Sequence, residues 1–181
     1  MTVAIMDTGN SKLEEPELEP EVPMECSNEK PEVLKGETGS VIPLFGKLSN
    51  LSPETRIEAA AEFVKIVKNG SEDNLNYSLN RLVKGLAANK GWSRPGFTMA
   101  LISILKNCEK VKVGVILEKI DEFLDYSNDN ENEKGIILGK TFCLAAIIKS
   151  KKGNLVEHVT IMKELFKIIR AKEYLSQEYF I

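Results

Sequence analysis

Segments of helical length, each with apolar residues along one side, recur from residue 53 to the last residues of this sequence. The clearest stretch is YSLNRLVKGLAANKGWSRPGFTMALISIL, residues 77–105, because two apolar stripes at helical spacing flank a turn. Asn89 and Gly91 favour the end of the first helix, and Ser93 favours the start of the next as its N-cap. The predicted helices begin at Pro53, at Asp73 or Asn74, at Arg94, at Lys110, at Glu133 and at Asn154, and a seventh begins at Ser176.

Taken in pairs, these helices start near residues 53, 94 and 133, about 40 residues apart. A two-helix unit of that length is typical of HEAT and armadillo repeats. Each pair is too thin to bury its apolar side alone, so neighbouring pairs stack on one another. The sequence therefore predicts an all-α fold, a HEAT/armadillo-like helical-repeat solenoid of about three helix pairs over residues 53–181.

The N-terminal part has a different composition. Residues 1–50 carry 10 acidic and 4 basic residues, a net charge of −6, and five of the seven prolines. Such a segment buries too little apolar surface to offset the entropy lost on ordering. We predict a disordered acidic tail rich in Pro and Glu at residues 1–46 and a linker at 47–52. Residues 41–45 (VIPLF) form an apolar island, which is compatible with docking on the domain or on a partner, and also with a free tail.

The last two predicted helices, over residues 133–149 and 154–172, have apolar residues on more than one side. In the second of them the two stripes are Leu155, Val159, Met162, Phe166 and Ile169, and Val156, Leu165 and Ile168. Helices that are apolar on two sides are flanked by other helices. We therefore expect a further repeat to follow, with the solenoid truncated at its C-terminal end.

Cysteine content and hydropathy exclude several classes of protein. Cys26, Cys108 and Cys143 are odd in number and widely spaced, which favours a reducing compartment over a disulfide framework or a zinc site. No apolar run reaches the length of a membrane span. The N-terminus lacks the basic-then-apolar pattern of a secretory signal. We expect a soluble intracellular protein with no membrane association.

Basic residues surround the turn within residues 77–105. Four positive charges around one turn suit contacts with phosphates or with an acidic partner segment. A tryptophan in such a turn can stack on a base or on a partner's side chain. A solvated polar face, with the tryptophan filling the gap between adjacent repeats, explains the same residues. The candidate nucleic-acid or partner-binding residues are Arg81, Lys84, Lys90, Trp92 and Arg94.

The sequence LNRLVKGLAANKGWSRPGFTMAL, residues 79–101, resembles the N-terminal part of the Myb-binding protein 1A / DNA polymerase V (phi) family. In that family an LKRLxxGL helix is followed by ARxGFxxAL. A weaker likeness extends from about Arg56 through EHVTIMKELFKIIRAKEYLSQ, residues 157–177. The motif consists mostly of Leu, Gly, Arg and Phe, so it indicates how helices pack and does not indicate an active site.

The resemblance implies a nuclear, chiefly nucleolar scaffold that acts in transcription of ribosomal RNA genes and in ribosome biogenesis. Its implied partners are transcription factors or pre-ribosomal proteins, with rDNA or chromatin as a further partner, and no small-molecule substrate. The family name also implies two alternatives, a DNA-binding protein and a DNA-directed DNA polymerase. Basic C-terminal tails of the resembling proteins have no counterpart in this sequence.

Polymerisation needs carboxylates that hold two divalent metals about 3.5–4 Å apart. Asp121 and Asp125 share a helix face, but this is the polar side of an amphipathic helix, where solvated acids are usual. His158 is the only histidine, so no triad built on a histidine stands out. The sequence therefore predicts no catalytic residue, no metal site and no cofactor.

Glycines inside predicted helices cost stability relative to alanine, roughly 1 kcal/mol each. Close approach of a neighbouring helix compensates for this cost. We expect such contacts at Gly85, Gly96 and Gly139.

Overall fold

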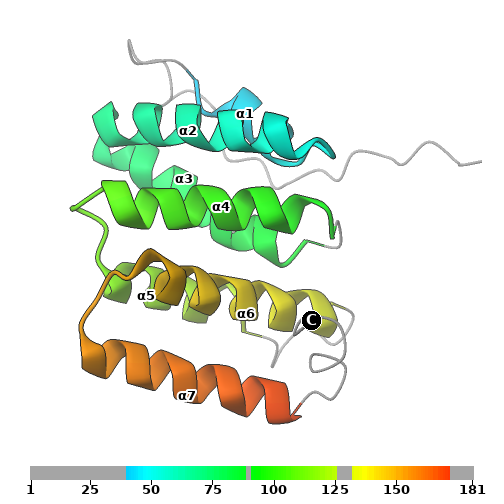
Figure 1. The fold of residues 1–181 in the computed structure, drawn as a ribbon, viewed down its shortest axis with the longest axis vertical. Helices are drawn as coiled ribbons and strands as arrows, with labels where there is room; N and C mark the ends of the chain where they lie inside the picture. The colour runs from blue at the N-terminus through cyan, green and yellow to red at the C-terminus, as the bar shows by residue number, and fades with distance from the viewer. Residues whose placement is uncertain (1–39, 89–90, 126–131, 172–181) are drawn as a thin grey trace, which may run out of the picture. The chain divides into compact units, whose positions relative to one another are not determined.

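The computed structural model describes residues 40–88, 91–125 and 132–171. Within these ranges every regular element is a helix, and no strand occurs, which confirms the predicted all-α class. Figure 1 shows the helices stacked in chain order from α1 to α7. The helices are α1 (Ile42–Leu48), α2 (Pro53–Asn69), α3 (Glu72–Leu86), α4 (Ser93–Asn107), α5 (Val113–Phe123), α6 (Glu133–Ser150) and α7 (Leu155–Ala171).

The repeat is visible in the helix starts. Helices α2, α4 and α6 begin at Pro53, Ser93 and Glu133, 40 residues apart in both cases. Helix α2 packs on α4 and α4 packs on α6, while α3 lies against α4, α5 and α6 (Figure 1). Each pair therefore buries its apolar side against the next pair, as a helical-repeat solenoid does.

The caps explain where the predicted helix starts match and where they differ. Ser52 Oγ accepts the Thr55 N–H at 3.2 Å, and α2 begins at Pro53 as predicted. Helix α3 begins earlier than predicted, because Ser71 Oγ accepts the Asn74 N–H at 3.2 Å. Helix α5 begins at Val113, three residues after the predicted start.

Replacing Ser71 with alanine is expected to lower the free energy of unfolding by about 1 kcal/mol, because the α3 N-terminus loses its side-chain cap. Urea unfolding followed by circular dichroism measures this loss. The exposed Asn76→Ala change on the same helix is the control and is expected to stay within about 0.5 kcal/mol of the unchanged chain. Equal stability of the two variants would contradict the role of the cap.

Helix α1 falls where the sequence predicts the end of the tail and the linker. The segment predicted as tail 1–46 and linker 47–52 is helical from 42 to 48, and residues 1–39 lie outside the described residues. Folded structure therefore includes α1, which precedes the predicted start of the domain at residue 53. The reason is packing, since a seven-residue helix has little stability of its own. The side chains that α1 buries in the core are Val41, Leu44, Phe45 and Leu48.

Phe45 is the anchor of α1. Its ring meets the rings of Phe63 and Phe97 edge to face, with centroid separations of 5.1 and 6.1 Å. Edge-to-face pairs add to the free energy gained by burial. Of the alternatives for residues 41–45, the structure has docking on the domain.

The predicted close approaches at the helix glycines are confirmed. A Cβ atom at Gly96 would overlap the backbone carbonyl of Leu48 in α1. One at Gly139 would lie 2.8 Å from the backbone nitrogen of Ala87, and one at Gly85 would overlap the ring of Phe97. Helices can approach this closely only because a side chain is missing.

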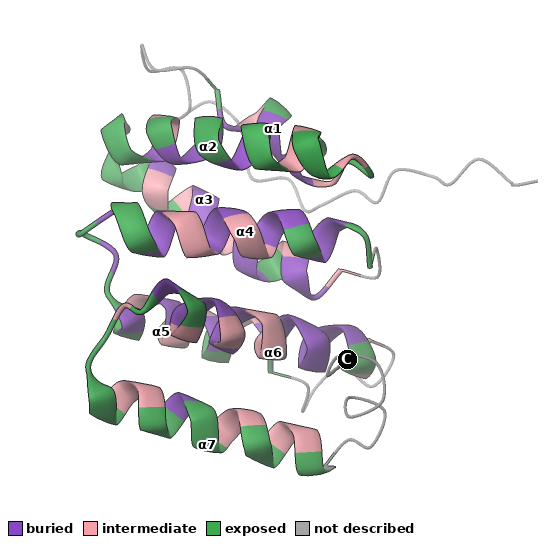
Figure 2. Ribbon diagram, in the orientation of Figure 1, coloured by how far each residue is buried: buried purple, intermediate pink, exposed green. Residues whose placement is uncertain are grey.

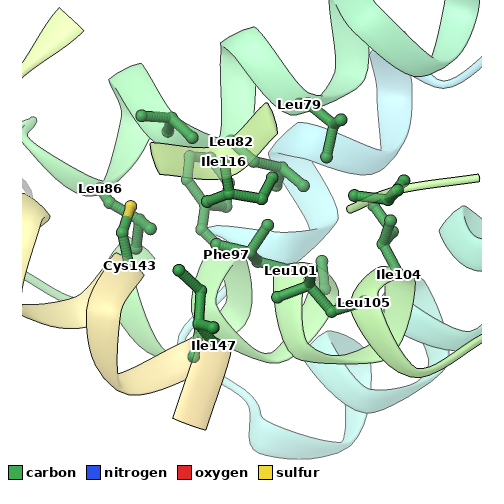
Figure 3. Close-up of a cluster of buried hydrophobic side chains, with 14 of the residues drawn as sticks. Leu79, Leu82, Leu86, Phe97, Leu101, Ile104, Leu105, Ile116, Cys143 and Ile147 are labelled. Carbon is green, nitrogen blue, oxygen red and sulfur yellow. The ribbon is translucent and has the colours of Figure 1, made fainter. Parts of the chain in front are cut away.

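The core lies between the stacked pairs. Figure 3 shows side chains of α3, α4, α5 and α6 meeting in one cluster. Cys108 and Cys143 are free, buried thiols that pack as small apolar groups, and burial raises the pKa of both. Cys26 lies outside the described residues. The labelled members of the cluster are Leu79, Leu82, Leu86, Phe97, Leu101, Ile104, Leu105, Ile116, Cys143 and Ile147.

Candidate interaction surface

The two arginines of the predicted basic set are held inside the domain. Arg81 is half-buried, its Nη1 donates to Tyr77 Oη at 2.9 Å, and its guanidinium lies 4.9 Å from the centroid of the Phe45 ring. Arg94 is buried, with 8% of its surface exposed. Its Nε donates to the Leu86 carbonyl at 3.1 Å and its Nη2 to the Ala88 carbonyl at 2.8 Å. These contacts join α1 to α3 and the end of α3 to α4.

The remaining members of the set are placed differently. Lys84 is exposed, and its Nζ lies 4.3 Å from the centroid of the Phe123 ring on α5. Trp92 is 46% exposed, so about half of its surface is open to solvent. Lys90 lies outside the described residues. The structure therefore does not bring the described members together on one exposed face.

The polymerase hypothesis depends on acidic residues. Asp121 and Asp125 are exposed on and just after α5. In the parts of the chain that the structure describes, no three His, Cys, Asp or Glu residues lie close enough together to hold a metal ion. His158 is half-buried, and its Nε2 lies 2.6 Å from the Lys152 carbonyl oxygen.

Exposed apolar residues gather on one helix instead. Of the eight large hydrophobic residues exposed in the described ranges, five lie on α7: Leu155, Val156, Val159, Met162 and Phe166. Figure 2 shows that α7 is mostly exposed or intermediate along its length. Its other side, with Ile161 buried and Leu165 and Ile168 packed against the core, faces the domain. Of the two predicted stripes, the one with Leu155, Val159, Met162 and Phe166 is therefore solvent-exposed, and Val156 lies with it rather than with Leu165 and Ile168.

Three cations lie beside this apolar row. Lys163, Lys167 and Arg170 are exposed and line an open hollow of about 670 Å³ together with Phe166. Lys167 Nζ is 4.0 Å from Glu164 Oε1, one turn away on the same helix. We call the five exposed apolar residues and these three cations the α7 outer face. The sequence already contains the signal, because these cations recur at i, i+4 and i+7.

The segment before α7 fixes the position of this helix. Asn154 and Glu157 form a reciprocal capping box, in which each side chain accepts the backbone N–H of the other at 2.9 and 2.7 Å. Lys152 Nζ donates to the Cys108 carbonyl at 2.6 Å, which ties the α6–α7 connection to the end of α4. The α7 outer face is thus presented by a helix with a defined start.

The sequence profile of the DNA polymerase phi family matches residues 77–180, more than half of the chain. The chain belongs to the DNA polymerase phi family. This match includes the residues on which the resemblance to the Myb-binding protein 1A / DNA polymerase V (phi) family was based. It also includes most of α3 and all of α4 to α7, and therefore the whole α7 outer face.

Curated relatives of the DNA polymerase phi domain are much longer. The chain is 26% identical over 150 residues to the rDNA transcriptional regulator pol5 of Schizosaccharomyces pombe, and the matched region covers 79% of this chain and 15% of that protein. It is 25% identical over 163 residues to Myb-binding protein 1A of Mus musculus, covering 88% and 12%. It is 24% identical over 170 residues to the rDNA transcriptional regulator POL5 of Saccharomyces cerevisiae, covering 76% and 17%.

The chain thus spans less than a fifth of the length of these relatives. No solved structure matches it. No helix in the three described ranges is long and apolar enough to cross a membrane.

Proposed function

We propose that this domain is a non-catalytic protein-binding module of a nuclear, chiefly nucleolar regulator of ribosomal RNA gene transcription and ribosome biogenesis. The names of the relatives support the setting, since two are rDNA transcriptional regulators and one is a Myb-binding protein. The partners we propose are transcription factors or pre-ribosomal proteins, with rDNA or chromatin reached through them.

The observation that carries this proposal is the exposed apolar row of α7. Apolar surface left in water costs roughly 25 cal/mol per Å², so a contiguous row of large apolar side chains favours burial against a partner. Helical repeats bind partners over extended surfaces of this kind. At the other end of the stack the same chemistry is already satisfied, because α1 buries its apolar side chains Val41, Leu44, Phe45 and Leu48 in the core.

The test is affinity purification of the whole chain from nuclei, with mass spectrometry and imaging of its location. We expect a nucleolar signal and enrichment of RNA polymerase I subunits or pre-ribosomal proteins over an unrelated helical-repeat domain. A cytoplasmic signal with no enrichment of either class would refute the proposal.

DNA polymerase activity and DNA binding, which the family name implies, are the alternative functions. Polymerase activity would be established if the unchanged chain extends a primer and the Asp121→Ala/Asp125→Ala variant does not. For DNA binding, a salt titration is decisive, because a protein that neutralises several phosphates loses affinity steeply as salt rises. Absence of binding at about 50 mM salt would remove that alternative.

A further inference from the structure

We propose that the α7 outer face binds an amphipathic helix whose apolar stripe is followed, at one end, by acidic residues. This inference rests on the proposed protein-binding function and specifies the chemistry of the partner. Three features of the face lead to it: the spacing of its apolar residues, the position of its cations and the positive charge that remains after Glu164 pairs with Lys167.

The spacing fits a helix. Leu155, Val159, Met162 and Phe166 recur at i, i+4, i+7 and i+11, which places them in one row along α7. At 1.5 Å per residue the row is roughly 16 Å long. A partner helix presents its own apolar stripe at the same spacing, so three turns of it would cover the row.

The charges predict which end of the partner helix lies over which end of α7. Lys163, Lys167 and Arg170 all lie in the C-terminal half of α7, whereas Leu155 and Val156 stand 78% and 75% exposed at its N-terminal end. Glu164 is paired within the helix, so the half that carries the cations is net positive. Acidic residues on the part of the partner that lies over this half would therefore strengthen binding and set its direction.

A second copy of this chain is a poorer occupant. In an antiparallel pairing of two α7 helices, the cations of one copy would lie over Leu155 and Val156 of the other. In a parallel pairing, cations would face cations, which is unfavourable. Neither arrangement supplies an acidic partner for Lys163, Lys167 and Arg170.

Nucleic acid would also use only half of the face. Phosphates would engage the three cations, but the apolar row beside them would stay in water, since phosphate contacts come from basic and polar groups. The observed combination of a long apolar row with a basic end therefore favours a protein helix.

The test uses the whole chain and a labelled helical peptide with a leucine stripe and glutamates over its last two turns. We expect fluorescence anisotropy to show binding that weakens as salt rises. A matched peptide with lysine at each glutamate position is expected to bind at least about tenfold more weakly. Phe166→Asp in the chain is expected to lower affinity for the acidic peptide by at least about tenfold.

Two controls separate binding from folding. Ile57 on α2 is 55% exposed, close to the 53% of Phe166. Ile57→Asp therefore also replaces an exposed apolar side chain with a carboxylate, but away from the α7 outer face. This variant is expected to bind the acidic peptide as the unchanged chain does. The double variant Lys163→Glu/Lys167→Glu is expected to reverse the preference between the two peptides, an outcome that a loss of folding cannot produce.

Several results would overturn the inference: no binding of the acidic peptide, equal binding of both peptides, or tighter binding of a short DNA or RNA duplex that Phe166→Asp leaves unchanged. Dimerisation of the chain that Phe166→Asp abolishes would also overturn it. If Phe166→Asp still recovers the nucleolar partners in full, the inference fails and the proposed function stands on another surface. If the unchanged chain recovers none, the proposed function fails as well.

Discussion

Replacing Gly96 with alanine is expected to destabilise the domain by about 3 kcal/mol and to release α1. The added methyl group would overlap the carbonyl of Leu48, which is backbone and cannot rotate away. Either α4 shifts, or α1 leaves and exposes the Phe45 ring. Urea unfolding measures the loss of stability, and amide hydrogen exchange measures the release, because freed α1 amides exchange faster than those of α4.

Gly114 and Gly46 are matched controls for this prediction. A Cβ atom at either position would meet nothing within 4 Å, and both residues lie in exposed helical positions. Gly114→Ala and Gly46→Ala are therefore expected to raise the free energy of unfolding by up to about 1 kcal/mol, since alanine favours helix. Gly96→Ala behaving like these controls would mean that α1 does not lie on α4 as observed.

The helical repeat could be predicted from the sequence because each signal of a solenoid lies within a short segment of the chain. Ser52 and Pro53 mark the start of α2, and the period of about 40 residues follows from apolar stripes and turns that each lie within one segment. The glycine contacts were predictable for a related reason. A glycine inside a strong helix pattern needs a compensating contact. Which residue makes that contact can be identified only from the structure.

Helix α1 was missed because its stability is not local. Seven residues with a proline among them look like the end of the acidic tail, and they become a helix only through burial of Phe45 and its neighbours. The burial of the two arginines in the basic set has a similar cause. The carbonyls that Arg94 binds and the ring beside Arg81 are brought to them by tertiary packing, so a count of charges near a turn cannot distinguish a free cation from a bound one.

The α7 outer face could be predicted from the sequence only in part. The sequence shows that the helix has two apolar stripes, and the structure packs Leu165 and Ile168 of one stripe against the core. Which stripe faces the core depends on tertiary packing, and Val156 shows that spacing alone assigns some residues to the wrong side.

Replacing Arg94 with methionine is expected to lower the free energy of unfolding by about 3 kcal/mol, because two hydrogen bonds from a charged donor are lost. The Leu86 and Ala88 carbonyls stand at the end of α3, where a positive charge also interacts favourably with the helix dipole. Urea unfolding of Arg94→Met measures the loss. Arg94→Lys is expected to recover only part of it, since an ammonium group cannot reproduce the planar geometry of the guanidinium.

The same variant separates a structural from a binding role for Arg94. The exposed Lys106→Ala change on α4 removes one positive charge at a surface position and is expected to stay within about 0.5 kcal/mol of the unchanged chain. Below the unfolding transition, Arg94→Met is expected to bind the acidic helical peptide as the unchanged chain does, because the guanidinium is turned toward the end of α3 and not toward solvent. A variant with unchanged stability but weakened binding of that peptide or of nucleic acid would return Arg94 to the interaction surface.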